Sequence, residues 1–457
     1  MTYASPSSLR LTLFLGVAAL AAAGLAPTTT GLEIDGVQPA ALDQPRVTMT
    51  LRQTADGEPI VGEAAGGLAG AQAEMLKELL DDPALQDLGI GEAIGQLAGG
   101  GGAAGAFTAF LDTGASGVML SGSQAAAMGL SYEKSEDGRR VVFEDVGVAG
   151  TEEFAVTTPL FVDLGTFAGG EIGEHMRGPF RLQVKPGGGM LENLTGPINL
   201  AGMPLMVRRV MVMDASGMSD LELLKTSLLP PGHPDIPRPD ANTVTVPLTY
   251  VDFADFTRTI PDSADPPSLA PSPMIGPDPS GVVMSEGPQP LSLHHHGQRI
   301  AGTWLLDTGA VASILSEKHA NALGVTVRED GSGLDGPGTD RQFTLPIGGV
   351  GGIKNVHGFF IEKLVVPTTG PKKDENLVYV NAPVLVLDIT ITHPQTGETF
   401  TLDGVFGMNY LVASAHVSTA GGMLGMPAIG DIRDTPFRHA VIDHAAQRMR
   451  LHPAHLD

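Results

Sequence analysis

The sequence contains no cysteine, a single tryptophan and only five tyrosines among its 457 residues. Without cysteine the chain has no disulfide framework, no cysteine-ligated zinc and no cysteine nucleophile. Secreted eukaryotic proteins of this size usually carry disulfides, so the composition favours a bacterial exported protein. Basic residues are also scarce: 27 stand against 51 acidic ones, a formal net charge of −24. Such a surface repels phosphate backbones, and we expect no nucleic-acid partner.

Long hydrophobic runs are missing as well. The longest one, Leu11 to Ala23, follows Arg10 and ends in three alanines. A short positive region, an apolar run and small residues form the pattern of a signal peptide, which we predict over residues 1–26. The run is shorter than the roughly 20 residues that a membrane-spanning helix needs. We therefore expect a secreted or periplasmic protein with no membrane span in its mature chain; an uncleaved N-terminal anchor is the alternative.

Glycine and proline are abundant, with 60 and 35 residues, which predicts many turns between short strands. One helical pattern, Ala71 to Leu97, is flanked by glycine and is interpreted as a small helical insertion. The proline-rich segment Leu229 to Asp240 cannot continue regular structure and is the predicted linker between two domains, residues 45–228 and 241–455. A second proline-rich stretch, Pro261 to Pro279, predicts a long loop.

The most informative feature is an internal repeat. Leu111 to Leu130 reads LDTGASGVMLSGSQAAAMGL, and Leu306 to Val325 reads LDTGAVASILSEKHANALGV. Aligned without a gap, the two blocks share 10 of 20 residues. One Asp-Thr-Gly tripeptide in a glycine-rich chain is a weak signal, whereas two in matched surroundings indicate a duplicated unit.

Two more features occur in both halves in the same order. An apolar-apolar-Gly-Met element follows each block, with Gly202 lying 90 residues after Asp112 and Gly407 lying 100 residues after Asp307. Between the block and this element, each half has a glycine-punctuated hairpin candidate, at residues 147–150 and 348–352. The duplication therefore covers most of each half.

This arrangement resembles the aspartic peptidases, in both their two-lobed pepsin-like and their dimeric retroviral forms. The resemblance covers roughly residues 45–453, and only the two DTGA blocks are specific. It implies a mostly β, two-lobed aspartic-protease-like β-barrel fold with pseudo-twofold symmetry. It also implies a secreted endopeptidase that binds polypeptides in an extended conformation. Because one chain contains both halves of the site, we expect a monomer.

Elementary chemistry supports the same assignment. An apolar strand delivers each carboxylate, and Gly114 or Gly309 allows the chain to turn sharply. If the halves are related by a twofold axis, Asp112 and Asp307 meet there and share one proton over a broad pH range. The ionised member can then accept a proton from water while the protonated member polarises a peptide carbonyl.

The resemblance adds a role for the threonines that follow the catalytic candidates. Thr113 and Thr308 would hydrogen-bond across the axis and lock the two loops. The predicted site therefore consists of Asp112 and Asp307 as catalytic residues, with Thr113, Gly114, Thr308 and Gly309 as loop support. Ser121 and Ser316 are the expected N-caps of the helices that follow.

Two departures from the pepsin-like pattern matter. Ala115 and Ala310 stand where a serine or threonine would hydrogen-bond an ionised carboxylate and lower its pKa. The pair should therefore titrate higher, and we predict an optimum at about pH 4–6. Neither hairpin candidate carries the flap tyrosine of that family; Tyr132 lies too close to the first block, and Phe143 and Phe154 are the nearest aromatic residues.

The sequence shows no clear motif for a metal site, a serine hydrolase or a zinc peptidase. His294, His295 and His296 lack acidic or cysteine partners at ligand spacing, so an exposed polar turn is favoured over a metal site. Neither G-x-S-x-G nor H-E-x-x-H occurs. Trp304 is expected to pack in the core. We predict no cofactor and no metal; the rival function is a catalytically silent peptide-binding or inhibitor-like protein on the same fold.

Overall fold

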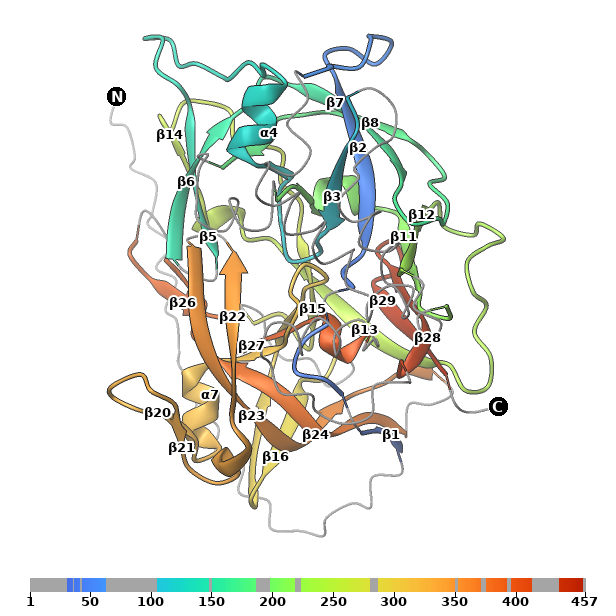
Figure 1. The fold of residues 1–457 in the computed structure, drawn as a ribbon, viewed down its shortest axis with the longest axis vertical. Helices are drawn as coiled ribbons and strands as arrows, with labels where there is room; N and C mark the ends of the chain where they lie inside the picture. The colour runs from blue at the N-terminus through green and yellow to red at the C-terminus, as the bar shows by residue number, and fades with distance from the viewer. Residues whose placement is uncertain are drawn as a thin grey trace, which may run out of the picture.

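The computed structural model describes residues 31–35, 37–41, 43–62, 105–147, 150–185, 198–217, 223–279, 287–349, 352–370, 375–392, 396–412 and 435–454 (Figure 1). The predicted signal peptide at 1–26 and the predicted helical insertion at 71–97 lie outside these residues. Among the described helices, none is long and apolar enough to cross a membrane.

The fold is mostly β, which confirms that part of the expectation. Two large sheets carry most of the strands, and two small sheets have two strands each. None of these sheets closes into a barrel within the described ranges, so the barrel expected from the sequence is not seen there.

The smaller of the two large sheets has ten strands, in the order β14-β5-β6-β9-β4-β10-β3-β2-β7-β8. All but β14 come from the first half of the chain. In chain order the strands are β2 (Arg46–Arg52), β3 (Phe107–Leu111), β4 (Met119–Leu120), β5 (Val142–Gly147), β6 (Gly150–Val156), β7 (Leu160–Thr166), β8 (Met176–Phe180), β9 (Gln183–Val184), β10 (Leu200–Ala201) and β14 (Arg258–Ile260).

The larger sheet has fifteen strands, mostly from the second half. They are β1 (Gly31–Ile34), β11 (Val210–Asp214), β12 (Lys225–Leu229), β13 (Val244–Val251), β15 (Ser272–Ile275), β16 (Leu291–His295), β17 (Gln298–Gly302), β18 (Trp304–Leu306), β19 (Ile314–Leu315), β22 (Phe343–Gly349), β23 (Gly352–Val366), β24 (Asn376–Val386), β27 (Gly404–Phe406), β28 (Phe437–Asp443) and β29 (Arg448–Pro453).

The remaining described elements are short. The small sheets pair β20 (Thr326–Val327) with β21 (Leu334–Asp335), and β25 (Thr390–Thr392) with β26 (Thr399–Thr401). The α-helices are α4 (Gly122–Ala127), α6 (Met203–Met206) and α7 (Glu317–Ala322). Single 3-10 turns are η2 (Ala254–Phe256), η3 (Thr339–Arg341) and η5 (Met408–Tyr410).

Local sequence accounts for these elements. In β2 the residues Val47, Met49 and Leu51 are buried while their neighbours are half-exposed, as expected of a strand with one face on a core. Both α4 and α7 begin at the predicted serine caps. Ser121 Oγ accepts the backbone N–H of Gln124 at 3.1 Å, and Ser316 Oγ accepts that of His319 at 3.3 Å.

The sequence repeat is also a repeat of local topology. In the first half β10 runs parallel to β3 and antiparallel to β4, with Leu200 opposite both Phe110 and Met119. In the second half β27 runs parallel to β18 and antiparallel to β19, with Val405 opposite both Leu305 and Ile314. The same three-strand unit therefore carries each DTGA loop.

The two halves also exchange strands (Figure 1). From the first half, β1 pairs in parallel with β24, and β11 pairs antiparallel with β28. From the second half, β14 pairs antiparallel with β5. In Figure 1 the dark blue β1 accordingly lies among orange strands, and the green β11 lies beside the red β28. These three strand pairings join the halves through backbone hydrogen bonds.

Both proline-rich segments connect strands. The segment Leu229 to Asp240 starts at the last residue of β12 and ends before β13, two strands of the same sheet. The stretch from Pro261 to Pro279 carries only the short strand β15 and crosses to the first half, where Gly117 forms a bridge with Leu269. Trp304 is fully buried in the core, as expected.

Candidate active site

The two DTGA loops meet face to face. Asp112 follows β3, and Asp307 follows β18. A Cβ atom built on Gly114 would lie 2.7 Å from Asp307 Oδ2, and one built on Gly309 would lie 2.8 Å from Asp112 Oδ1. Each carboxyl group therefore lies against the glycine of the opposite loop, and no larger residue fits there. The two carboxyl groups also hydrogen-bond to each other.

Thr113 and Thr308 join the loops by reciprocal hydrogen bonds. The Thr113 hydroxyl donates to Leu306 O at 2.6 Å and accepts the backbone N–H of Thr308 at 3.1 Å. The Thr308 hydroxyl donates to Leu111 O at 2.6 Å and accepts the backbone N–H of Thr113 at 3.1 Å. Both threonines are fully buried, so these four bonds are not exposed to competition from solvent. The hydroxyls hold the two loops in one geometry.

Backbone amides orient each carboxylate in the same way. Asp112 Oδ1 accepts the N–H groups of Gly114 and Ala115 at 2.8 and 3.0 Å. Asp307 Oδ1 accepts those of Gly309 and Ala310 at 2.8 and 2.9 Å. One oxygen of each carboxyl group is therefore saturated by its own loop. The other oxygen of each carboxyl group remains for the partner carboxyl or for a reacting molecule.

Burial and proximity set the electrostatics of the pair. Burial raises the pKa of Asp112, while hydrogen bonds from Asp307 and the loop amides oppose that shift. Burial also raises the pKa of Asp307 well above its usual range, and the neighbouring Asp112 carboxylate adds to the shift. Because two adjacent carboxylates repel, the pair retains one proton over a wide pH range.

The apolar-apolar-Gly elements lie directly beneath the loops. The N–H of Asp112 donates to Ala201 O at 3.2 Å, and that of Asp307 donates to Phe406 O at 3.0 Å. A Cβ atom on Gly202 would lie 2.6 Å from Ala115 O. Glycine is therefore required, because the chain passes too close to the loop for a side chain.

A segment of each half also hydrogen-bonds to the residue that follows the DTGA loop of the other half. The N–H of Ala41 donates to Val311 O at 2.8 Å, and the N–H of Ala270 donates to Ser116 O at 2.8 Å. Val311 and Ser116 occupy the same position in the two blocks, four residues after the aspartate. Sequence reasoning missed these contacts, because the partners are far apart in the chain and no motif links them.

Both hairpins expected from the glycine clusters are present. They are β5–β6 and β22–β23, whose tips at residues 148–149 and 350–351 lie outside the described residues. Phe143 and Phe154 face each other across the first hairpin and are buried in a small core cluster. Tyr132 is stacked against Arg140, whose guanidinium carbon is 4.1 Å from the ring centre. Phe143, Phe154 and Tyr132 all lie outside the two loops that contain the aspartates.

The histidine triplet only partly matches the exposed turn expected for it. His296 and Gly297 form the turn of the β16–β17 hairpin, with φ angles of 45° and 79°. His295, in contrast, is buried, and its Nε2 lies 2.9 Å from Pro337 O. The correction has a simple cause: side chains alternate along β16, so His295 faces the core while His294 faces outward.

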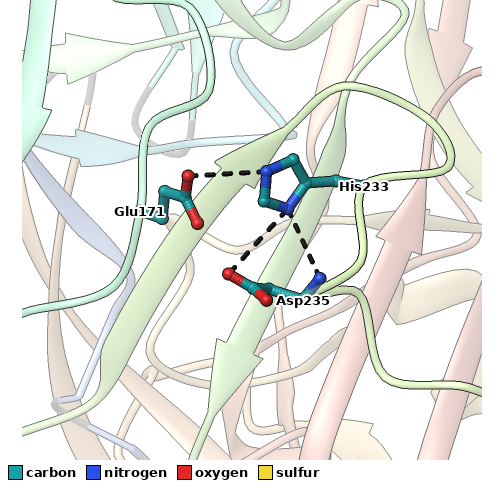
Figure 2. A group of neighbouring side chains, drawn as sticks. All are labelled: Glu171, His233 and Asp235. Atoms are coloured by element: carbon teal, nitrogen blue, oxygen red, sulfur yellow. Dashed lines mark hydrogen bonds and ion pairs between the residues drawn. The ribbon is translucent and has the colours of Figure 1, made fainter.

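One group of potential metal ligands occurs among the described residues, away from the DTGA loops (Figure 2). His233 Nε2 lies 3.4 Å from Glu171 Oε1, while His233 Nδ1 lies 3.4 Å from Asp235 N and 4.0 Å from Asp235 Oδ2. The carboxylates approach opposite nitrogens of the ring, which point away from each other. This arrangement suits a bridge that ties the proline-rich connection to the first half better than a shared metal ion.

None of the protein-family models or curated proteins compared with the chain matches it. The assignment of function therefore depends on the chemistry of the paired loops.

Proposed function

We propose that this chain is an aspartic-type endopeptidase with a two-lobed aspartic-protease-like fold, in which Asp112 and Asp307 form the catalytic pair. The observation that carries the proposal is the hydrogen-bonded carboxyl pair, held by the same set of bonds from each half. A single aspartate in a turn needs no such partner. Here two aspartates come from duplicated loops, and each carboxyl group packs against the glycine of the opposite loop. This arrangement supports a catalytic role for the pair.

In the proposed reaction the pair supplies both a base and an acid. The ionised carboxylate takes a proton from a water molecule as the water oxygen attacks the peptide carbonyl carbon. The protonated carboxyl group gives its proton to the carbonyl oxygen, which forms a tetrahedral diol. The C–N bond then breaks as a proton passes to the nitrogen, and the products are a carboxylic acid and an amine. Each cycle returns the pair to its singly protonated state.

The hydrogen bonds to Oδ1 of each aspartate favour the proposed proton transfers, because they fix the geometry of the pair. Because one oxygen of each carboxyl group accepts two backbone N–H bonds, the side chains cannot rotate away from each other. Such preorganisation lowers the cost of reaching the transition state. The substrate would be a polypeptide in an extended conformation lying between the halves. We further propose a secreted or periplasmic monomer with no bound cofactor.

The first test is proteolysis of an unfolded protein substrate between pH 4 and 6. We expect wild type to cleave it, and Asp112→Asn and Asp307→Asn each to lower kcat/KM by about 100-fold or more, because each removes one proton-transfer group. Asp262→Asn, at an exposed loop position, serves as a control with full activity. Binding of unfolded peptide without cleavage would instead favour the silent peptide-binding alternative. Full activity in either active-site variant would refute the proposed pair.

A further inference from the structure

The segment that precedes β2 belongs to the second half by its contacts. We call residues 37–41 and 43–44 the N-terminal strap; Pro45, which follows, already contacts the first half, because its carbonyl oxygen accepts the N–H of Leu111 at 2.9 Å. Val37, Gln38, Ala40 and Ala41 are buried. Upstream, β1 is paired with β24 along four residues. The strap therefore runs along the second half before the chain enters the first.

Three hydrogen bonds join the strap to the neighbourhood of Asp307. The backbone N–H of Ala41 donates to Val311 O at 2.8 Å, and the Gln44 side chain donates to Gly309 O. The Asn409 side chain donates to Gln38 O at 3.3 Å. These partners lie in the DTGA loop and in the apolar-apolar-Gly element beneath it. The strap thus contacts both supports of the second carboxylate.

A buried polar chain extends the last of these bonds into the loop. The Ser313 hydroxyl donates to Asn409 Oδ1 at 2.7 Å and accepts the N–H of Gly407 at 2.9 Å. Ser313 and Asn409 are fully buried. Such a chain is expensive to disrupt, because any partner left unpaired in the core loses its solvation without compensation.

The first half cannot build this chain. Aligning the two repeats places Val118 opposite Ser313 and Pro204 opposite Asn409, and neither side chain can donate or accept a hydrogen bond. The backbone contact of Ala41 has its counterpart at Ala270, whereas the Ser313–Asn409 chain has no side-chain equivalent at the matching positions. Two otherwise matching loops therefore differ in how they are supported.

The Gln44 contact reaches the carboxylate itself through one peptide unit. Gly309 O and Ala310 N belong to the same amide group. Gln44 donates to this oxygen, and the N–H donates to Asp307 Oδ1 at 2.9 Å. Donation to the oxygen of an amide polarises it and strengthens the hydrogen bond that its N–H makes. Gln44 thereby acts on Asp307 without touching it.

We propose that the N-terminal strap is a positioning element for the second carboxylate loop, with Gln44 and Asn409 as its positioning residues. The idea rests on the proposed function. It assigns the strap to the working enzyme rather than to a removable leader. Any maturation cleavage must then fall before Val37, and a cut between Val37 and Ala41 should weaken the support of the Asp307 loop more than that of the Asp112 loop.

The test uses the full chain with Gln44→Met, which removes the donor at similar side-chain volume. We expect amide exchange of the loop containing Gly309 and Ala310 to quicken by about tenfold, the equivalent of one lost hydrogen bond. Exchange at Gly114 and Ala115 should stay unchanged and provides an internal reference. Gln289→Met is the matched control, because Gln289 Nε2 also donates to a glycine carbonyl, that of Gly287, at an exposed site.

Activity provides a second readout. Gln44→Met should lower kcat by about tenfold with little change in KM, because the substitution acts through the peptide group that holds Asp307. For the same reason the pH–rate profile should shift. The double variant Ser313→Val, Asn409→Leu imitates the apolar pair of the first half and should show the same selective quickening of exchange. Equal change in both loops, or no change in either, overturns the proposal. If wild type shows no peptidase activity, the proposed function fails, while the exchange measurement still decides the role of the strap.

Discussion

The alanines that follow the two Asp-Thr-Gly tripeptides leave the carboxyl pair without a side-chain hydroxyl donor at these positions. Ala115 and Ala310 donate only backbone N–H groups to the carboxylates, and both side chains are half-exposed. A hydroxyl at either position would add a hydrogen bond to the ionised form. The site therefore combines burial, which raises the pKa of both aspartates, with fewer stabilising donors than a serine or threonine would provide.

Replacing the alanines should move the pH profile. For Ala115→Ser and Ala310→Ser we expect the acidic limb of the kcat profile to shift down by roughly 0.5–1 pH unit, since the new hydroxyl stabilises the ionised carboxylate. Wild type should show its maximum between about pH 4 and 6. A wild-type maximum below about pH 3, or serine variants with an unmoved acidic limb, would contradict this account.

At the scale of single elements, the glycines beneath the loops decide how closely strands can approach. Gly202 begins α6 and has an ordinary negative φ of −81°, so its requirement for glycine is one of space. A Cβ atom there would lie 2.6 Å from Ala115 O, which is backbone and cannot move aside. The close approach is also what allows Met203 N to donate to Ala115 O at 2.9 Å.

Gly202→Ala should therefore destabilise the protein by several kcal/mol, about 3 as an order of magnitude, because it overpacks a site bounded by backbone. Urea unfolding would measure the loss. Gly331→Ala is the comparison: Gly331 has a positive φ of 69°, but a methyl group added there would meet no atom within 4 Å. Its cost should be limited to about 1–2 kcal/mol for the left-handed conformation. Equal losses in the two variants would show that crowding at Gly202 is unimportant.

For the molecule as a whole, two buried histidines should make the fifteen-stranded sheet sensitive to acid. His444, in the turn between β28 and β29, is buried, and its Nδ1 lies 2.8 Å from Tyr250 Oη on β13. Burial lowers the pKa of His444 to about 3. Burial and the neighbouring His439 lower the pKa of His452 to about 4. Both histidines are therefore neutral in the folded protein at mildly acidic pH.

The sign of the effect follows from proton linkage. Because the folded pKa is depressed, the unfolded chain binds a proton first as the pH falls below about 6.5, and stability is lost from there down to the folded pKa. The raised pKa of the aspartates works in the opposite direction, since the folded pair binds protons more readily than the unfolded chain. His444 and His452 connect the β28–β29 hairpin to Tyr250 and Thr243, so acid should loosen the contact of this hairpin with β13.

His444→Asn should reduce this acid sensitivity, because the amide oxygen can still accept from Tyr250 but does not titrate. We expect its free energy of unfolding to fall less steeply between pH 6.5 and pH 4, with a slope lower by up to about 1.4 kcal/mol per pH unit. Urea unfolding at several pH values would measure the slope. A slope equal to that of wild type would contradict the assignment.

The sequence alone determined the parts that depend on local pattern. Duplication of the DTGA blocks, the serine caps, the strand ahead of each aspartate and the two hairpins all follow from short-range chemistry and from comparing one half of the chain with the other. For the same reason the sequence predicts turn or loop positions at Gly114, Gly202 and Gly309. The exposed turn at the histidines was only partly right, because alternation along β16 buries His295.

The meeting of the two DTGA loops follows from the resemblance, whereas the other contacts between distant segments emerge only in the tertiary structure. Nothing local in Gln44 or Ala270 indicates a partner, because their bonds cross from one half to the other. The exchange of β1, β14 and β11 between halves is equally invisible in a linear pattern, since strand pairing depends on which edges remain open once each half has folded. One clue was available: Ser313 and Asn409 are polar where the other repeat has Val118 and Pro204, and a buried polar residue needs a partner.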